Sequence, residues 1–289
     1  MIDAHAHLWL EQRGMVDGLP VYALGGGRSQ FGREVRQMLP PAMTDGVNSA
    51  ERFLAHMDFS RVGGAVITQE YIDGNQDAYL RSVRETYPDR FRVCALYEEK
   101  GIPDTDGLDG IKICAARLAE PDLLKHAAVF EAAARRNLFI GIDLADGDAQ
   151  TGALGELARQ YPGLRIASGH FGMVTRPGWE EQIRLACLPN VYVESGGITW
   201  LFNAEYYPYP SAIRAILTAR DLCGMDKLMW GSDYPRTMTA ITYRMSWDFI
   251  EKSPLLTTGE KQQFFHENAH GFYRCGPLPE LPEIHHMAE

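Results

Sequence analysis

The amino-acid sequence predicts a single (β/α)8 TIM-type barrel, in which eight parallel strands alternate with helices. Short apolar runs recur along the chain, and most are followed by a loop and a segment with helical periodicity. The runs are apolar on both faces, as strands of a parallel sheet are when helices cover them. A length of 289 residues suits such a barrel, which needs about 250. No GxGxxG motif follows the first run, which argues against a doubly wound sheet.

The expected strands follow directly from the apolar runs. They are Ile2–His7, Ala65–Gln69, Phe91–Tyr97, Leu108–Cys114, Leu138–Leu144, Leu164–His170, Val191–Ser195 and Leu228–Ser232. The expected helices are Ser49–Phe59, Asn75–Tyr87, Asp122–Arg136, Ala149–Tyr161, Trp179–Ala186, Ser211–Leu222, Tyr243–Ile250 and Thr258–Tyr273. The interval after Tyr97 (EEKGIPDTDG) is too polar and too short for a helix, so we expect one crossover without one. Asn48 is the candidate N-cap of the first helix.

Two segments fall outside the alternation. Leu10–Asn48 is predicted to be a long loop, and because it leaves the first strand and carries four arginines, we expect it to close over a substrate. Residues 276–289 contain three prolines and are predicted to be a surface tail in which His285 and His286 are solvated. The expected organisation is therefore one barrel domain over residues 1–275, followed by the tail 276–289.

Composition excludes several classes of function. The net charge of −10 repels phosphate backbones and anionic lipids, so neither nucleic acid nor membrane is an expected partner. No apolar run is long enough for a membrane span, and the N-terminus does not resemble a signal peptide. The five cysteines are widely spaced without a CxxC pair, which favours a reducing, cytoplasmic location. The expected partner is a small molecule, and homo-oligomerisation stays open.

The strongest chemical signal is Asp3-Ala4-His5-Ala6-His7 in the first strand. Because side chains alternate along a strand, we expect Asp3, His5 and His7 to share one face and Ile2, Ala4 and Ala6 to share the other. The two imidazoles would then be close enough to bind one metal ion. They lie near the carboxyl end of the strand, which is the catalytic end of a barrel.

Two further groups end other predicted strands. His170 ends the strand that reads RIASGHFG, and Asp233 follows the strand in LMWGSDYP. Either residue alone has an ordinary interpretation as a capping or turn residue. Together with His5 and His7, however, they are expected to converge around the barrel axis. The sequence therefore predicts a site in which imidazoles and a carboxylate bind a metal or move protons.

These residues carry a resemblance to a known family. The DxHxH motif at Asp3–His7, GIK at Gly110–Lys112, SGH at Ser168–His170 and WGSDYP at Trp230–Pro235 resemble the amidohydrolase superfamily, in its amidohydrolase-related branch. That branch contains lactonases and aryl-acid decarboxylases, and the similarity spans nearly the whole chain. The resemblance assigns His5, His7, His170 and Asp233 to the metal or catalytic cluster, with Asp233 and His170 as catalytic groups.

One position departs from the family pattern. Metal-dependent members usually have a histidine at the end of the fifth strand, where this chain offers Asp143. The lactonase subgroup resembles this arrangement, and several of its members work without a metal. Lys112 suggests a carbamylated bridging ligand, but Asp143 argues against a binuclear centre. The expectation is one divalent ion, zinc, with metal-free catalysis as the alternative.

The leading hypothesis is that the protein hydrolyses a small carboxylated or sugar-acid lactone, or a related ester or amide. Asp233 would act as general base toward water. Lys112, Arg176 and Arg28 are the chosen candidates for binding the substrate carboxylate; Arg13, Arg117 and Arg236 complete the candidate set. The alternatives are a metal-dependent decarboxylase of an aromatic or unsaturated acid, and a barrel that binds a ligand without turnover.

Overall fold

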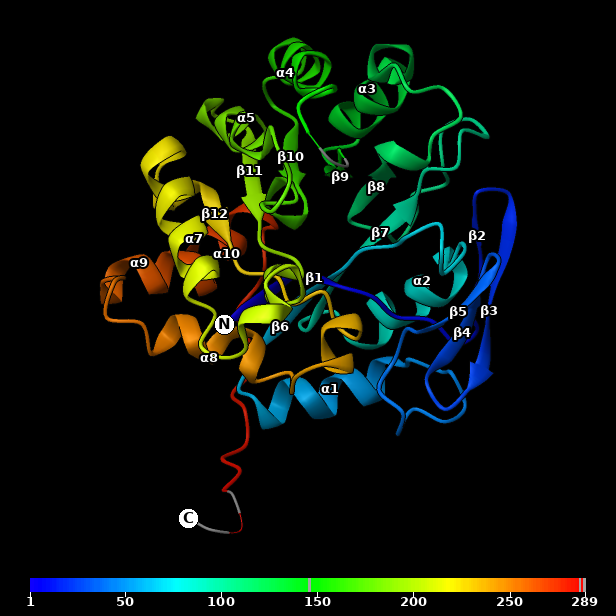
Figure 1. The fold of residues 1–289 in the computed structure, drawn as a ribbon. Helices are drawn as coiled ribbons and strands as arrows, with labels where there is room; N and C mark the ends of the chain where they lie inside the picture. The colour runs from blue at the N-terminus through cyan, green and yellow to red at the C-terminus, as the bar shows by residue number, and fades with distance from the viewer. Residues whose placement is uncertain (145–146, 286, 288–289) are drawn as a thin grey trace.

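The fold is a closed barrel of eight parallel strands with helices around it (Figure 1), which confirms the predicted fold class. The computed structural model describes residues 1–144, 147–285 and 287. The strands are adjacent in sequence order, β1-β6-β7-β8-β9-β10-β11-β12. Backbone hydrogen bonds join the first strand to the segment around the last. The Ala4 N–H donates to the Trp230 carbonyl, and the His7 N–H donates to the Tyr234 carbonyl, each over 2.8 Å.

All eight predicted strands occur, each with ends within three residues of the expected ones. Their bounds are β1 (Ile2–Ala6), β6 (Gly64–Ile67), β7 (Phe91–Leu96), β8 (Gly110–Cys114), β9 (Phe139–Asp143), β10 (Arg165–Ser168), β11 (Val191–Glu194) and β12 (Leu228–Met229). Adjacent strands of the barrel run parallel. For example, Ile111 of β8 lies beside Ile140 of β9, and Ile166 of β10 lies beside Val191 of β11. The apolar run was therefore a sufficient signal for each strand of the barrel.

Helices follow most strands, as predicted. The α-helices are α1 (Ala50–Phe59), α2 (Asp77–Thr86), α3 (Ala127–Arg135), α4 (Thr151–Gln160), α5 (Trp179–Arg184), α6 (Ile198–Leu201), α7 (Pro210–Cys223), α8 (Met245–Glu251), α9 (Thr258–Gln262) and α10 (Asn268–Phe272). Short 3₁₀ segments cover Ala115–Arg117, Leu123–His126, His170–Gly172, Leu185–Cys187, Asn203–Glu205, Met225–Lys227 and Arg236–Thr239. The crossover from β7 to β8 has no helix, as expected. The N-cap of α1 is Ser49, whose side chain accepts from the Arg52 N–H, so the choice of Asn48 was wrong.

The barrel interior is apolar at its amino end. Ile2, Ala4, Val66, Phe139 and Met229 pack there in one cluster. The predicted helix Thr258–Tyr273 is split by a π-helical turn at Gln263–Glu267. Its last part, α10, contributes Phe272 to the same cluster, and the C-cap Tyr273 packs there too. The polar site described below is therefore confined to the opposite, carboxyl end of the barrel.

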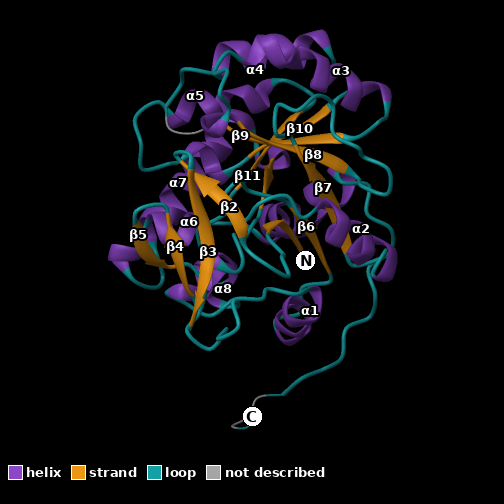
Figure 2. Cartoon of the chain, turned by 90° about the vertical axis from the view of Figure 1, so that its right-hand side faces the viewer, coloured by secondary structure: helices purple, strands orange, loops and turns teal. Residues whose placement is uncertain are grey.

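The segment Leu10–Asn48 is not a plain loop, and that prediction was wrong. It contains a four-stranded antiparallel sheet of β2 (Arg13–Val16), β3 (Leu19–Gly25), β4 (Arg28–Phe31) and β5 (Glu34–Gln37), in that spatial order. Figure 2 shows this sheet, here called the insertion sheet, on the outside of the barrel. Its inner face packs Val16, Val21 and Phe31 against Ile72 of the loop after β6. Turn dipeptides at Asp17-Gly18 and Gly32-Arg33 mark its hairpins.

Several remaining expectations concern the periphery. Residues 276–285 form no helix or strand, and Leu278 packs over Gly63 and Gly64. His286, part of the predicted tail, lies outside the described residues. All five cysteines are free. None of the helices in the described ranges combines the length and apolarity that a membrane span requires.

Candidate active site

A cavity of about 400 Å³ opens at the carboxyl ends of the barrel strands. This size is sufficient for a small-molecule ligand. Its walls mix charged and apolar side chains from the carboxyl ends of seven of the barrel strands and the segments that follow them. The lining residues are His7, Glu70, Ile72, Cys114, Ala116, Arg117, Asp143, Leu144, Gly169, His170, Met173, Gln182, Trp200, Asp233 and Arg236.

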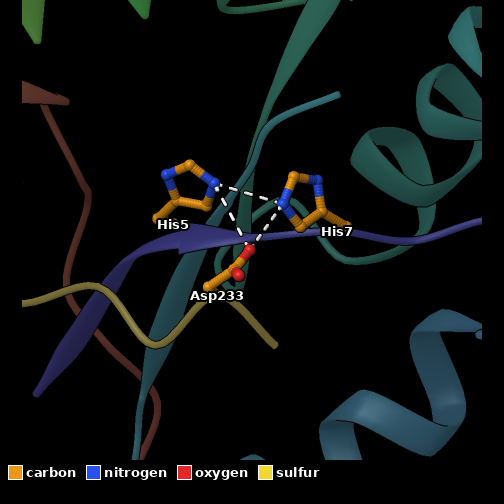
Figure 3. A group of neighbouring side chains, drawn as sticks. All are labelled: His5, His7 and Asp233. Carbon is orange, nitrogen blue, oxygen red and sulfur yellow. Dashed lines mark hydrogen bonds and ion pairs between the residues drawn. The ribbon is translucent and has the colours of Figure 1, made fainter. Parts of the chain in front are cut away.

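Three predicted residues, His5, His7 and Asp233, point toward one another, as Figure 3 shows. His7 and Asp233 line this cavity, and His5 lies behind them against a small inner cavity. His7 Nε2 lies 3.0 Å from Asp233 Oδ1 and 3.1 Å from His5 Nε2, and His5 Nε2 lies 3.8 Å from the same carboxylate oxygen. All three side chains are buried. The second Asp233 oxygen accepts a hydrogen bond of 2.8 Å from the Trp200 indole N–H. The structure therefore brings together residues that are more than 220 positions apart.

The face assignment along β1 was wrong in part. The register of β1 against β6 shifts between Asp3 and Ala6, so the strict alternation breaks there. Ile2 and Ala4 pack inside the barrel, but Ala6 packs outside it against the helices. The Asp3 carboxylate accepts hydrogen bonds from the Ser232 hydroxyl and the Tyr243 hydroxyl, which lie apart from the imidazoles. Asp3 thus ties β1 to the segment after β12, and the irregularity allows His5 and His7 to face the site.

Glu194, at the end of β11, positions His5. Its Oε1 lies 2.6 Å from His5 Nδ1, and its Oε2 accepts the Gly196 N–H at 2.5 Å. Glycines at 169, 196 and 231 surround this carboxylate, and a Cβ at any of them would lie 2.8 Å from one of its oxygens. The glycines of the SGH, ESGG and WGSD segments therefore create the space for one buried carboxylate. With Nδ1–H donated to Glu194, the lone pair of His5 Nε2 points toward His7 and Asp233.

His170 belongs to a neighbouring group. Its Nδ1 lies 2.9 Å from the Gly196 carbonyl, and its Nε2 lies 3.5 Å from Asp143 Oδ2. Burial alone would lower the pKa of His170, but the Asp143 carboxylate outweighs burial and raises it to about 10. Lys112 is buried and pairs with the same Asp143 oxygen at 2.7 Å. It lines a small inner cavity below the site instead of the substrate-sized cavity, so the structure places it as the partner of Asp143.

A second ion pair lies on the other side of the trio. Arg236 Nη2 contacts Asp73 Oδ2 at 2.5 Å, and its Nη1 lies 3.7 Å from Asp233 Oδ1. Asp73 also accepts from the Gln12 amide at 3.1 Å, and Gln12 accepts from the Ser29 hydroxyl of β4 at 2.6 Å. A continuous chain of buried contacts therefore runs from the insertion sheet to Asp233.

Burial and the nearby Arg236 set the protonation states of Asp233 and His7. Burial would raise the pKa of Asp233, but the hydrogen bond from His7 and the charge of Arg236 hold it well below its usual range. Burial, reinforced by Arg236, lowers the pKa of His7 well below its usual value. At neutral pH the pair is therefore an ionised carboxylate beside a neutral imidazole. Asp233 and His170 also adopt left-handed backbone angles (φ 59° and 53°), which are uncommon for residues other than glycine.

The donor set fits a divalent metal ion. His5, His7 and Asp233 offer two imidazole nitrogens and a carboxylate oxygen within 4.8 Å of one another, which is the ligand chemistry of zinc and similar ions. The carboxylate–histidine contact from Glu194 matches the arrangement that orients metal-binding imidazoles.

The charges around the three histidines also favour a bound cation. Four carboxylates lie within 4.0 Å of a ring nitrogen of the three histidines, and two cations, Lys112 and Arg236, pair with these carboxylates; the carboxylates are Asp73, Asp143, Glu194 and Asp233. With His170 protonated as well, one net negative charge remains, which favours binding of a cation.

The four predicted ligands do not form one group. Within the described residues, His170 shares a potential site with His5 and Asp143, whereas His7 and Asp233 share another with His5. His5 is common to both, and its ring centroid lies 4.6 Å from that of His170.

Of the arginines predicted to bind substrate, some line the cavity and others do not. Arg117 and Arg236 line the cavity. Arg28 is exposed on β4 and donates to the Gly25 carbonyl, and Arg176 is exposed in the loop after β10. Neither Arg28 nor Arg176 is among the cavity-lining residues, and no described residue between 10 and 48 is. The insertion sheet packs on the loop after β6 instead of closing over the cavity, so the expected role of its arginines has no support.

Sequence reasoning missed three side chains of the site: Glu194, Asp73 and Trp200. Each is a single residue without a neighbouring histidine or cysteine to mark it. Glu194 offered one signal, because a carboxylate ending an apolar strand before two glycines has no packing explanation.

A family model described as amidohydrolase matches residues 2–275. The chain belongs to the amidohydrolase family. This confirms the resemblance drawn from the DxHxH and WGSDYP motifs. No curated protein matches the sequence.

Solved structures share the fold of this amidohydrolase. A probable 2-pyrone-4,6-dicarboxylic acid hydrolase from Acinetobacter baumannii with bound citric acid is 17% identical, with a TM-score of 0.71 over 94% of this chain and 98% of its own. An amidohydrolase from Burkholderia multivorans with bound zinc is 16% identical, with a TM-score of 0.68 over 96% and 99%. A 5-carboxyvanillate decarboxylase from Novosphingobium aromaticivorans, complexed with manganese and 4-hydroxy-3-methoxy-5-nitrobenzoic acid, is 17% identical, with a TM-score of 0.52 over 78% and 80%.

Proposed function

We propose that this amidohydrolase opens a small lactone that carries a carboxylate, either a simple carboxylated lactone or a sugar-acid lactone. Related esters or amides would react by the same chemistry. The observation that carries the proposal is the ionised Asp233 at the floor of a substrate-sized cavity, 3.0 Å from His7. Arg117 and Arg236 in the cavity wall supply positive charge for a substrate carboxylate. The shared fold with a pyrone-dicarboxylic acid hydrolase supports the same class of substrate.

The chemistry follows from the placement of these groups. Asp233 accepts a proton from water as the water oxygen forms a bond to the lactone carbonyl carbon. His170, protonated at neutral pH, stabilises the negative charge that develops on the carbonyl oxygen. The ring carbon–oxygen bond then breaks, and the proton passes from Asp233 to the leaving oxygen. The product is the open hydroxy acid.

One divalent ion, zinc, would be held by His5, His7 and Asp233, and it would supply positive charge that polarises the carbonyl and acidifies water. The zinc in the Burkholderia multivorans amidohydrolase supports this choice of ion. Glu194 would keep His5 in the tautomer that presents Nε2 to the ion. The metal-free alternative uses the same Asp233 and His170, with an activated lactone as the electrophile.

Decarboxylation of an aromatic or unsaturated carboxylic acid is the second candidate. The apolar part of the cavity wall, formed by Ile72, Leu144, Met173 and Trp200, suits an aromatic ring. The fold shared with the 5-carboxyvanillate decarboxylase supports this reading. A panel of carboxylated lactones and aryl acids, followed by pH-stat titration and carbon dioxide detection, separates the two. Lactone opening consumes base without releasing carbon dioxide, and the opposite result would replace the hydrolase proposal.

Metal analysis gives a first prediction. We expect one zinc ion or none per chain, because the two potential sites that contain histidine share His5. The third group, Glu70, Cys114 and Asp143, offers no imidazole, and its Asp143 already pairs with Lys112. Elemental analysis after dialysis against limiting zinc measures the ratio. Removal of the ion with a chelator should abolish turnover if the ion is required and leave it unchanged in the metal-free alternative. Two tightly bound ions per chain would contradict the prediction.

Glu194→Gln gives a second prediction. Loss of the charged partner of His5 should weaken zinc binding by about 10- to 100-fold, the usual effect of removing such a contact. Competition with a chromophoric chelator measures the affinity directly, without activity. The control is Glu131→Gln on the exposed face of α3, which should bind zinc like the wild type. Equal zinc affinity of Glu194→Gln and the wild type would show that Glu194 only fills space.

A further inference from the structure

Within the described part of the chain, the outermost strand of the insertion sheet pairs with a neighbouring strand on one side only. β5 (Glu34–Gln37) pairs with β4 and ends the spatial order β2-β3-β4-β5, and all four of its residues are exposed. Figure 2 shows it at the free edge of the sheet. The opposite edge is covered, because the N–H groups of Arg13 and Met15 in β2 donate to the carbonyls of Asp73 and Tyr71. One edge alone is therefore open to another strand.

The backbone of β5 has N–H and C=O groups that do not pair with β4. The β4–β5 hairpin closes Phe31 opposite Glu34 through the two-residue turn Gly32-Arg33, in which Gly32 has a φ of 61°. The closing pair of such a turn is hydrogen-bonded, and hydrogen-bonded pairs alternate along an antiparallel ladder. Val35, opposite Gln30, is therefore a pair that turns its N–H and C=O away from β4. Those two groups lie on the open edge.

The side chains of β5 are arranged symmetrically about Val35. Val35 is 55% exposed and lies on the outer face in the same cross-strand row as Tyr22, which is 45% exposed. Glu34 and Arg36 lie on the other face, one on each side of Val35, and Arg36 Nε contacts Glu34 Oε1 at 2.6 Å. Read in the opposite direction, Glu-Val-Arg becomes Arg-Val-Glu. In an antiparallel pair the segment that best complements this sequence is therefore the sequence itself.

We propose that β5 pairs with β5 of a second copy of this chain, antiparallel and about a two-fold axis beside Val35. The two Val35 residues would exchange their outward N–H···O=C bonds. Glu34 of each copy would lie opposite Arg36 of the other, which replaces the contact within one strand by two contacts between strands. The insertion sheets would join into one sheet, with the apolar side chains of the two outer faces side by side. Because the β2 edge is already covered, the assembly stops at two copies, as expected of an isologous contact.

Charge exchange tests this pairing. Sedimentation equilibrium of the wild type over rising concentration should show a weight-average mass that approaches twice that of one chain. Glu34→Arg places two positive charges around Val35, and Arg36→Glu places two negative ones, so each variant alone should stay monomeric. An equimolar mixture restores opposite charges across the two-fold axis and should regain the dimer. No contact within one strand predicts this rescue.

Three further samples make the experiment decisive. Val35→Pro removes the outward N–H and should remain monomeric when mixed with either charge variant. Glu251→Arg on α8 makes the same charge change away from β5 and should dimerise like the wild type. Thermal unfolding of each variant checks that the barrel is folded. A wild type that stays monomeric, single charge variants that dimerise normally, or a mixture that fails to regain the dimer would each overturn the proposal.

Discussion

Replacing Asp233 by Asn should lower kcat and kcat/KM together by about 10²-fold or more, the usual loss for a general base. Asn keeps the size of the side chain but cannot accept a proton at neutral pH. The wild-type carboxylate is ionised because His7 and Arg236 hold its pKa well below the usual range. KM should change much less than kcat. Steady-state kinetics with the best lactone from the substrate panel measures both.

A matched variant separates the charge from the hydrogen bond. Trp200→Phe removes the indole N–H that donates to Asp233 Oδ2 and keeps the carboxylate. Its effect on kcat should be smaller than that of Asp233→Asn. If Asp233→Asn turned over at a near-normal rate, the base would lie elsewhere, and Asp143 at the end of β9 would be the next candidate. Circular dichroism of both variants confirms that the loss does not come from unfolding.

Replacing Lys112 by Met should destabilise the fold by about 3–5 kcal/mol at pH 7, the usual cost of removing one partner of a buried ion pair. Lys112 Nζ lies 2.7 Å from Asp143, and the variant leaves that buried carboxylate with only the more distant His170, 3.5 Å away, as a cationic partner. Urea unfolding at equilibrium measures the change. The control is Lys125→Met, which breaks an exposed pair with Glu120 and should unfold like the wild type. Equal stabilities of Lys112→Met and the wild type would mean that Asp143 is already neutral.

The same variant has a predicted pH dependence. Burial would raise the pKa of Asp143, but Lys112 and His170 together outweigh it and hold the pKa well below the usual range. A carboxyl whose pKa is lower in the folded state contributes stability above its unfolded pKa and loses it as the pH falls through the folded one. The wild type therefore keeps this contribution from pH 7 to pH 5. In Lys112→Met, the loss of the Lys112 charge lets burial move the pKa of Asp143 upward, so the destabilisation should be smaller at pH 5 than at pH 7.

The barrel could be predicted from the sequence because each strand is buried on both faces and appears as an uninterrupted apolar run. The insertion sheet could not be recognised in the same way. Only one of its faces is buried, and glycines and a proline interrupt the alternation between Arg13 and Gln37. Its hairpins were nevertheless marked by turn dipeptides such as Asp17-Gly18, where both residues have a positive φ. Turn chemistry was a better guide there than periodicity.

The residues of the candidate site could also be predicted only in part. His5, His7, His170 and Asp233 were found because they end strands that must converge in a barrel. The shift of register in β1, which separates Asp3 from the imidazoles, follows from contacts with β6 and the segment after β12 and leaves no local trace. Glu194 and Asp73 act through neighbours that are distant in sequence, so Asp73 had no local signal and Glu194 had only its position at the end of an apolar strand. Arg28 was assigned to a loop, but it lies on β4 of the insertion sheet and does not line the cavity.

The buried path from Ser29 through Gln12 and Asp73 to Arg236 has a consequence for how this enzyme can be re-engineered. Barrel enzymes are attractive hosts for transplanted loops because their scaffold and their connections are usually separable. Here the connection between β1 and α1 cannot be exchanged on its own. Its Gln12 holds Asp73, and Asp73 pairs with Arg236 beside the proposed base. A graft that replaces residues 10–48 must therefore import Gln12 and Ser29 together, or redesign Asp73 and Arg236 with it.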